Sequence, residues 1–292
     1  MARHRAHNAA AIIGVVVLVI VLIVGALGAY RWLRSHWFAP TPPSAHCEVT
    51  LDQTTAQLSF EQARNATIIA AVAQQRGLPP RAVSIAYATT LQESRMENLD
   101  YGDRDSLGLF QQRPSMGWGT EAEIMDPYYS TGKFFDVMVT VDDWQNADIG
   151  DVAQEVQRSG YPDAYDQHIE KARMLASALT GQSPAAWSCV VRDSAAATPG
   201  DFITHLTQAY GSLVTSDLAP ADQDSPARLT LTTPTEPLAW AVAAFAQSWS
   251  TQVGVTAVSV GDHQWAASAD ALPVWTEQPG SGVSPTTVSV TF

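Results

Sequence analysis

Cys47 and Cys189 are the only cysteines among the 292 residues of the chain. An even cysteine count beyond an export segment is typical of a disulfide, and one pair leaves one connectivity. The bond would close a loop of about 140 residues and, by chain entropy, stabilise the fold by roughly 4 to 5 kcal/mol. Any fold of this chain must then bring these two positions together. The alternative is two unrelated buried thiols.

A stretch without charges runs from Ala9 to Tyr30 and includes IIGVVVLVIVLIVGALGA. As a helix it is long enough to cross roughly 30 Å of hydrocarbon. Arginines flank both ends, so the positive-inside rule decides the orientation only weakly. We expect a cytoplasmic N-terminus at residues 1–8 and a transmembrane helix at residues 9–30.

A disulfide would place the rest of the chain outside the cytoplasm, so we expect a single-pass protein of the cell membrane. Secretion after cleavage of a signal peptide is the alternative, because small residues near positions 25–29 suit a signal peptidase. Its apolar core is normally about 7 to 15 residues, however.

The composition, with 46% hydrophobic and 15% charged residues, is that of folded globular material. The formal net charge of -13 argues against a nucleic acid partner. The seven histidines are scattered and HExxH is absent, so we expect no metal site and no cofactor.

Proline content and the helical or strand-like spacing of apolar residues divide the exported part into three segments. Prolines make residues 31–46 an extended linker. Residues 47–190 read as almost wholly helical, whereas ARLTLTT and VTAVSV alternate like strands around the helical run PLAWAVAAFAQSWSTQVG. The predicted fold class is therefore mainly α: a helical domain at 47–190, a small α/β domain at 198–292 and one N-terminal transmembrane helix.

Two helices are predicted in sequence near the start of the helical domain. Ser59 and Gln62 have the spacing of a capping box, and the helix that they begin has a plausible stop at Gly77. Pro80 begins the next helix, RAVSIAYATTLQES, so Glu93 lies in its last turns. The helix dipole and an apolar surface both favour a protonated carboxyl group there. A general acid near neutral pH requires that form.

Glu93 and Ser94 are followed, about a dozen residues later, by the run DSLGLFQQRP. This pattern resembles the catalytic domain of soluble-type lytic transglycosylases, which are related in fold to goose-type lysozymes. In that family a Glu-Ser pair closes a buried helix and Gly-Ala-x-Gly-Leu-Met-Gln, an apolar pair and Pro follow. Gly108, Leu109, Gln111 and Pro114 are identities.

The third motif of the family, Tyr-Asn-Ala-Gly, is replaced by Gln157, Arg158, Ser159 and Gly160. In the family the tyrosine is implied to orient the catalytic acid. Its loss leaves open whether Gln157 takes over as hydrogen-bond donor or Tyr161 does so.

The resemblance implies cleavage of the β-1,4 bond between N-acetylmuramic acid and N-acetylglucosamine in peptidoglycan, with Glu93 as the catalytic acid and base. A transglycosylase uses the muramoyl 6-hydroxyl as nucleophile and needs no second carboxylate. A hydrolytic lysozyme uses water and would need one. Asp100, Asp103 and Asp105 are candidates, although they also read as turn-forming aspartates.

Further residues are candidates for binding the sugar. By resemblance, Ser94 would contact the sugar or the acid, and Gly108 would let the glycan approach the backbone. Amide groups and aromatic rings are the remaining candidates, and the rings also read as packing residues: Gln111, Gln112, Gln157, Tyr101, Trp118 and Tyr161.

The resemblance ends near residue 185, and the last domain holds four of the nine tryptophans, most of them expected in the core. It reads as a structural accessory, or as a module that binds the wall or a cell-wall machinery protein. Two alternatives to the enzyme stay open. One is a catalytically inactive, glycan-binding scaffold of a cell-wall or secretion machine, and the other is an accessory protein for solutes or metals.

Overall fold

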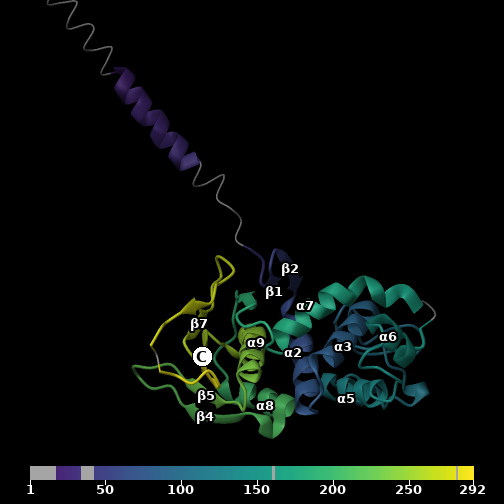
Figure 1. Ribbon diagram of the computed structural model, residues 1–292. Helices are drawn as coiled ribbons and strands as arrows, with labels where there is room; N and C mark the ends of the chain where they lie inside the picture. The colour runs from purple at the N-terminus through teal and green to yellow at the C-terminus, as the bar shows by residue number, and fades with distance from the viewer. Residues whose placement is uncertain (1–17, 34–42, 160–161, 281) are drawn as a thin grey trace, which may run out of the picture. The chain divides into compact units, whose positions relative to one another are not determined.

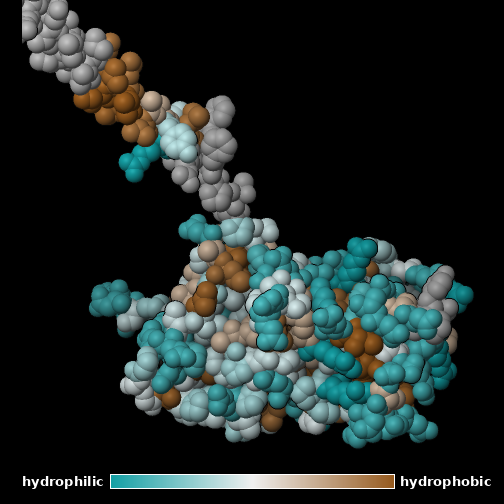
Figure 2. Space-filling view, turned by 45° about the horizontal axis from the view of Figure 1, so that its top comes forward, coloured by the Kyte–Doolittle hydropathy of each residue, from teal (hydrophilic) through white to brown (hydrophobic). Residues whose placement is uncertain are grey.

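The computed structural model describes residues 18–33, 43–159, 162–280 and 282–292. They fall into two units, Met1–Pro42 and Pro43–Phe292. In the first unit residues 18–33 form a helix with exposed apolar side chains (Figure 2). The predicted cytoplasmic N-terminus at residues 1–8 and most of the linker lie outside the described residues.

The predicted transmembrane helix at residues 9–30 is corrected by the structure. Across the described ranges, no helix combines the length and the apolar character that crossing a membrane requires. The described part of this helix covers residues 18–33, and Arg31 lies within it. Residues 9–17 lie outside the part that is described.

The second unit begins with a small antiparallel sheet. Strands β1 (His46–Leu51) and β2 (Thr54–Leu58) form a hairpin, and β3 (Trp187–Val190) pairs with the other side of β1. Cys47 is opposite Cys189 in the register of β1 and β3, and the two form a disulfide. The predicted bond is confirmed.

This sheet also shows that the prediction of a mainly α chain was wrong. The described part of the chain contains helices and also two antiparallel sheets, one of three strands and one of six. The sequence HCEVTLDQTTAQL reads weakly as strand because β1 and β2 have only six and five residues. The pairing of β1 with β3 depends on residues more than a hundred positions away.

The remaining elements between β2 and β3 are helical: α2 (Phe60–Gln75), α3 (Pro80–Glu93), η1 (Pro114–Met116), α4 (Glu121–Ile124), α5 (Pro127–Met138), α6 (Ile149–Gln157), η2 (Pro162–His168) and α7 (Ile169–Leu179). The capping box of Ser59 and Gln62 at the start of α2 is confirmed. Gly77, just beyond α2, adopts a positive φ of 68°, which glycine tolerates.

Helix α3 is the centre of this helical part. Its residues from Ala82 to Leu91 are buried on all sides, and α2, α5, α6 and α7 contact it (Figure 1). Glu93 is its last residue and Ser94 its C-cap. A core helix, held on several sides, therefore positions the predicted acid.

The rest of the chain forms a six-stranded sheet with two helices. The elements are α8 (Pro199–Tyr210), η3 (Gly211–Leu213), β4 (Thr215–Ala219), β5 (Arg228–Thr232), α9 (Glu236–Val253), β6 (Ala257–Val260), β7 (His263–Ala266), β8 (Thr276–Glu277) and β9 (Thr287–Thr291). The strand order is β4-β5-β9-β6-β7-β8 and every pairing is antiparallel. The expected small α/β domain is thus an antiparallel sheet whose buried face packs against α9.

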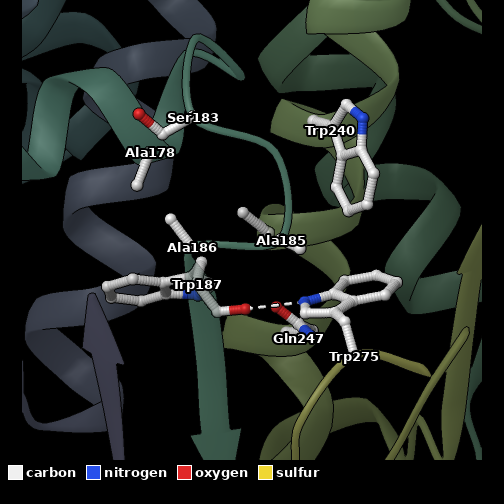
Figure 3. Close-up of a pocket in the computed structure, with 9 residues that line it drawn as sticks. Ala178, Ser183, Ala185, Ala186, Trp187, Trp240, Gln247 and Trp275 are labelled. Atoms are coloured by element: carbon white, nitrogen blue, oxygen red, sulfur yellow. Dashed lines mark hydrogen bonds between the residues drawn. The ribbon is translucent and has the colours of Figure 1, made fainter. Parts of the chain in front are cut away.

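The sheet part and the helical part share one core. Helix α9 packs along α2 and also contacts α7 and β3. The indole of Trp187 donates to the Ser248 hydroxyl at 3.1 Å, and that of Trp275 donates to the Trp187 carbonyl at 2.9 Å (Figure 3). The cavity left between these side chains is only about 10 Å³. The predicted segments 47–190 and 198–292 therefore lie within one compact unit.

Candidate active site

Glu93 is held by a tyrosine that the sequence motifs did not indicate. The Tyr165 hydroxyl, in η2, donates a hydrogen bond of 2.6 Å to Oε1 of Glu93. Tyr165 is fully buried, and burial followed by the contact with Glu93 raises the pKa of its phenol. The phenol therefore stays protonated and can keep donating to the carboxyl group.

Burial is the main influence on the acidity of Glu93. It raises the pKa of the carboxyl group above the usual 4.5, and hydrogen bonds from Tyr165 and Gln157 lower the pKa to a smaller extent. The buried position thus favours the protonated acid, while the two donors support the carboxylate once the proton has left. A group that first donates and then accepts a proton must be stable both as the acid and as the carboxylate.

The carboxyl group of Glu93 lies on the wall of an open cleft of about 950 Å³. This is the size of a site for an extended ligand rather than for a small ion. The predicted site residues that line the cleft with Glu93 are Asp103, Gln111, Trp118 and Gln157. The cleft therefore brings together residues from α3, the loop after it and α6.

The second motif forms a tight turn that two other elements hold in place. Its ends pair with each other, because the Leu107 and Gln112 backbones exchange hydrogen bonds of 2.9 and 3.0 Å. The Ser94 hydroxyl donates to the Leu109 carbonyl at 2.7 Å, and the Gln157 amide donates to the Phe110 carbonyl at 2.7 Å. The turn is thus tied both to the end of α3 and to the end of α6.

Ser94 and Gly108 stabilise this turn through contacts with the rest of the protein and do not line the cleft. Ser94 is only 4% exposed. Gly108 has a φ of +75°, and a Cβ there would meet the Ile124 carbonyl oxygen at 2.8 Å. The lack of a side chain at this position is explained by packing against α4 rather than by the approach of a glycan.

The two glutamines of the motif point to different places. Gln111 lines the cleft and its amide donates to the Gly108 and Tyr101 carbonyls at 3.2 and 3.3 Å. Gln112 is 1% exposed and donates to the Ser130 carbonyl at 3.0 Å. Gln111 can therefore offer its carbonyl oxygen to a ligand, whereas Gln112 joins the turn to α5.

Of the two described aromatic candidates, one lines the cleft and the other does not. Trp118 packs against the core and presents one side to the cleft. Tyr101 is 68% exposed and does not line the cleft. Tyr161, the other candidate partner of Glu93, lies outside the described residues, as does Gly160.

None of the three aspartates is placed as a close partner of Glu93. Asp100 is exposed and does not line the cleft. Asp103 lines it but is 92% exposed and pairs with Arg104 at 3.8 Å. Asp105 accepts hydrogen bonds from Arg113 and from the Ser115 backbone, at 2.6 and 2.9 Å. These contacts, those from Ser115 above all, lower the pKa of Asp105.

Sequence reasoning missed Tyr165 and the cations of the cleft. Tyr165 lies a few residues after Gln157 in the sequence, but that spacing does not indicate that its side chain reaches Glu93. The structure also places Arg104, Arg113, Lys133 and Arg158 along the cleft. The sequence does not indicate that these four cations lie along one cleft.

No protein-family model matches the chain, and a search of curated proteins finds no relative either. The geometry and the chemistry of the cleft therefore carry the functional argument.

Proposed function

We propose that this chain cleaves peptidoglycan glycan strands at the β-1,4 bond between N-acetylmuramic acid and N-acetylglucosamine, with Glu93 as the single catalytic acid and base. The observation that carries the proposal is the half-buried Glu93 carboxyl group, which faces the cleft and accepts the hydrogen bond from Tyr165. The resemblance of the Glu93–Pro114 motifs to lytic transglycosylases supports the choice of substrate.

In the first half of the reaction Glu93 gives its proton to the glycosidic oxygen as the bond from that oxygen to C1 breaks. Positive charge then develops at C1 and the ring oxygen. The ionised carboxylate stabilises this charge, while Tyr165 and Gln157 stabilise the carboxylate.

In the second half the muramoyl 6-hydroxyl attacks C1 and returns its proton to Glu93, which leaves a 1,6-anhydro product. No water is consumed, so no second carboxylate is required. Of the described residues that line the cleft, the other carboxylates are Asp103, whose side chain is 92% exposed, and Asp136, which pairs with Arg76. This arrangement favours the transglycosylase over a hydrolytic lysozyme.

We also propose that the protein acts outside the cytoplasm, where its substrate lies. The disulfide between Cys47 and Cys189 supports this location, because such bonds persist in oxidising compartments.

Mass spectrometry of muropeptides released from purified sacculi tests the reaction. We expect products about 18 Da lighter than their hydrolytic counterparts, the mass of one water. Glu93→Gln keeps the size of the side chain and should release none, whereas Tyr101→Phe, outside the cleft, should act as wild type.

Two results would redirect the proposal. Reducing-end products without the mass difference would select the hydrolytic lysozyme. If neither wild type nor Tyr101→Phe released any muropeptide while both bound sacculi, the inactive glycan-binding scaffold would replace the enzyme.

A further inference from the structure

The cleft carries more positive charge than the chain as a whole. The sequence has 16 Lys and Arg against 29 Asp and Glu. The charged residues that line the cleft are instead mostly cations: Arg104, Arg113, Lys133 and Arg158 against Glu93, Asp103 and Asp136. When Glu93 is protonated, as an acid must be before it acts, the excess of cations grows by one. The ligand of such a cleft is expected to be anionic.

The carboxylates that line the cleft do not neutralise the cations that line it. Asp136 pairs with Arg76, which does not line the cleft. Asp103 faces Arg104 at 3.8 Å, and both side chains are more than two thirds exposed, so water screens this pair. Lys133 lies 5.5 Å from the ring of Tyr129, a contact that leaves its charge intact.

Hydrogen bonds to neighbouring residues fix the orientation of the Arg113 guanidinium. Its Nε donates to Asp105 at 2.6 Å and one terminal nitrogen donates to the Ser115 hydroxyl at 3.2 Å. The side chain is only 27% exposed. A guanidinium has five N–H donors, so donors remain for a ligand after these two bonds. Asp105 therefore orients a cation of the cleft instead of serving as a second catalytic carboxylate.

Arg158 occupies a backbone position that glycine normally fills. It is the C-cap of α6 with φ 52° and ψ 43°, in the left-handed region, where helices commonly end on glycine. Its side chain is exposed, lines the cleft and makes no hydrogen bond or ion pair within the described ranges. Backbone strain of this kind gathers at functional sites. The strain and the free guanidinium together point to a role for this side chain in binding.

We propose that the cleft selects glycan strands whose muramoyl units carry a free lactyl carboxylate, with Arg158 and Arg113 as the residues that bind it. The inference rests on the proposed function and names the form of the substrate. A lactyl carboxylate is attached to the sugar ring itself, so it lies within reach of cations that share one cleft with Glu93. In strands with stem peptides this carboxyl group is an amide and has no charge. A reaction that hydrolyses the bond between muramic acid and the peptide would supply the preferred substrate.

Binding affinity tests this without relying on turnover. The full chain with Glu93→Gln is titrated with three probes, and the fluorescence of Trp118 and the other tryptophans reports binding. The first probe is the tetrasaccharide of two GlcNAc-MurNAc units with free lactyl carboxylates. The second is the same tetrasaccharide with both carboxyl groups as methylamides, and the third is chitotetraose.

We expect the first probe to bind at least about tenfold more tightly than the other two, a difference typical of hydrogen bonds to charged groups. Added salt should weaken only the first complex. Arg158→Gly should remove most of the preference while the melting temperature stays equal or rises, because glycine relieves the left-handed conformation. The control Arg173→Gln, on the exposed side of α7, should keep the preference.

Similar dissociation constants for the three probes, or a preference that survives in Arg158→Gly, would overturn the inference and leave the proposed cleavage standing. A chain that bound none of the probes and released no muropeptide from sacculi would overturn both.

Discussion

Tyr165 and Glu93 are 72 positions apart in the sequence and 2.6 Å apart between the phenol oxygen and Oε1. The tyrosine comes from the short helix η2, which contacts both α3 and α6. In this protein a tyrosine further along the chain than Gln157 donates to the acid. The proposed mechanism depends on this contact, because it orients the acid and supports its ionised form.

Tyr165→Phe removes the hydrogen bond and keeps the ring. The carboxylate of Glu93 loses a donor, so the pKa of Glu93 rises further and the alkaline limb of the rate profile moves to higher pH. We expect kcat to fall about tenfold near neutral pH. Muropeptide release measured across pH checks this, with Tyr101→Phe as control. An unchanged pH profile would show that the tyrosine does not act on Glu93.

Stability should also depend on pH through Glu93. Because its pKa is raised on folding, the folded state binds the proton more tightly than the unfolded state. The contribution of Glu93 is therefore zero below the usual pKa of 4.5 and becomes destabilising as pH rises from there through the folded pKa. Glu93→Gln removes this effect. The stability of the variant relative to wild type should rise as pH increases above 4.5 through the raised pKa of Glu93, as measured by urea unfolding. A difference that is constant with pH would contradict the buried position of the acid.

Gly181→Ala tests the packing between the helical part and α9. A Cβ at Gly181 would lie 1.8 Å from the Pro237 carbonyl oxygen, at the start of α9, and φ is +76°. Backbone must move to make room, and we expect a loss of about 3 kcal/mol or more in the free energy of unfolding. Gly77→Ala is the matched control, because φ is +68° and no atom lies within 4 Å. It should cost only about 1 kcal/mol, from the strained φ. Equal losses in the two variants would mean that α9 does not pack tightly on the loop after α7.

Replacing Cys47 and Cys189 together by serine removes the disulfide. The bond spans 142 positions, and in the chain-entropy treatment its loss costs about 5 kcal/mol of stability. Denaturant unfolding of wild type with and without a reductant gives the same comparison, and the double variant should not respond to the reductant. If reduction left the stability of wild type unchanged within about 1 kcal/mol, the unfolded state would not be restricted by the bond.

Several features of this protein were determined by the sequence because they depend on neighbours a few positions apart. The capping box of Ser59 and Gln62 begins α2, and Pro80 begins α3, so Glu93 was expected at a helix end. The disulfide followed from the presence of only two cysteines. The turn after Glu93 was visible from its glycine and its spacing to the Glu-Ser pair.

The tertiary structure alone decided which groups meet at the cleft. The sequence suggested that Ser94 and Gly108 contact the ligand and that Asp105 could be a second carboxylate. In the structure Ser94 binds the turn, Gly108 packs against α4 and Asp105 accepts a hydrogen bond from Arg113. The pairing of β1 with β3 and of Tyr165 with Glu93 joins positions far apart in the chain. Such contacts form only when the intervening elements have packed, because the entropy of closing long loops must first be offset by buried surface. Local signals therefore indicated where the acid lies, and packing decided what surrounds it.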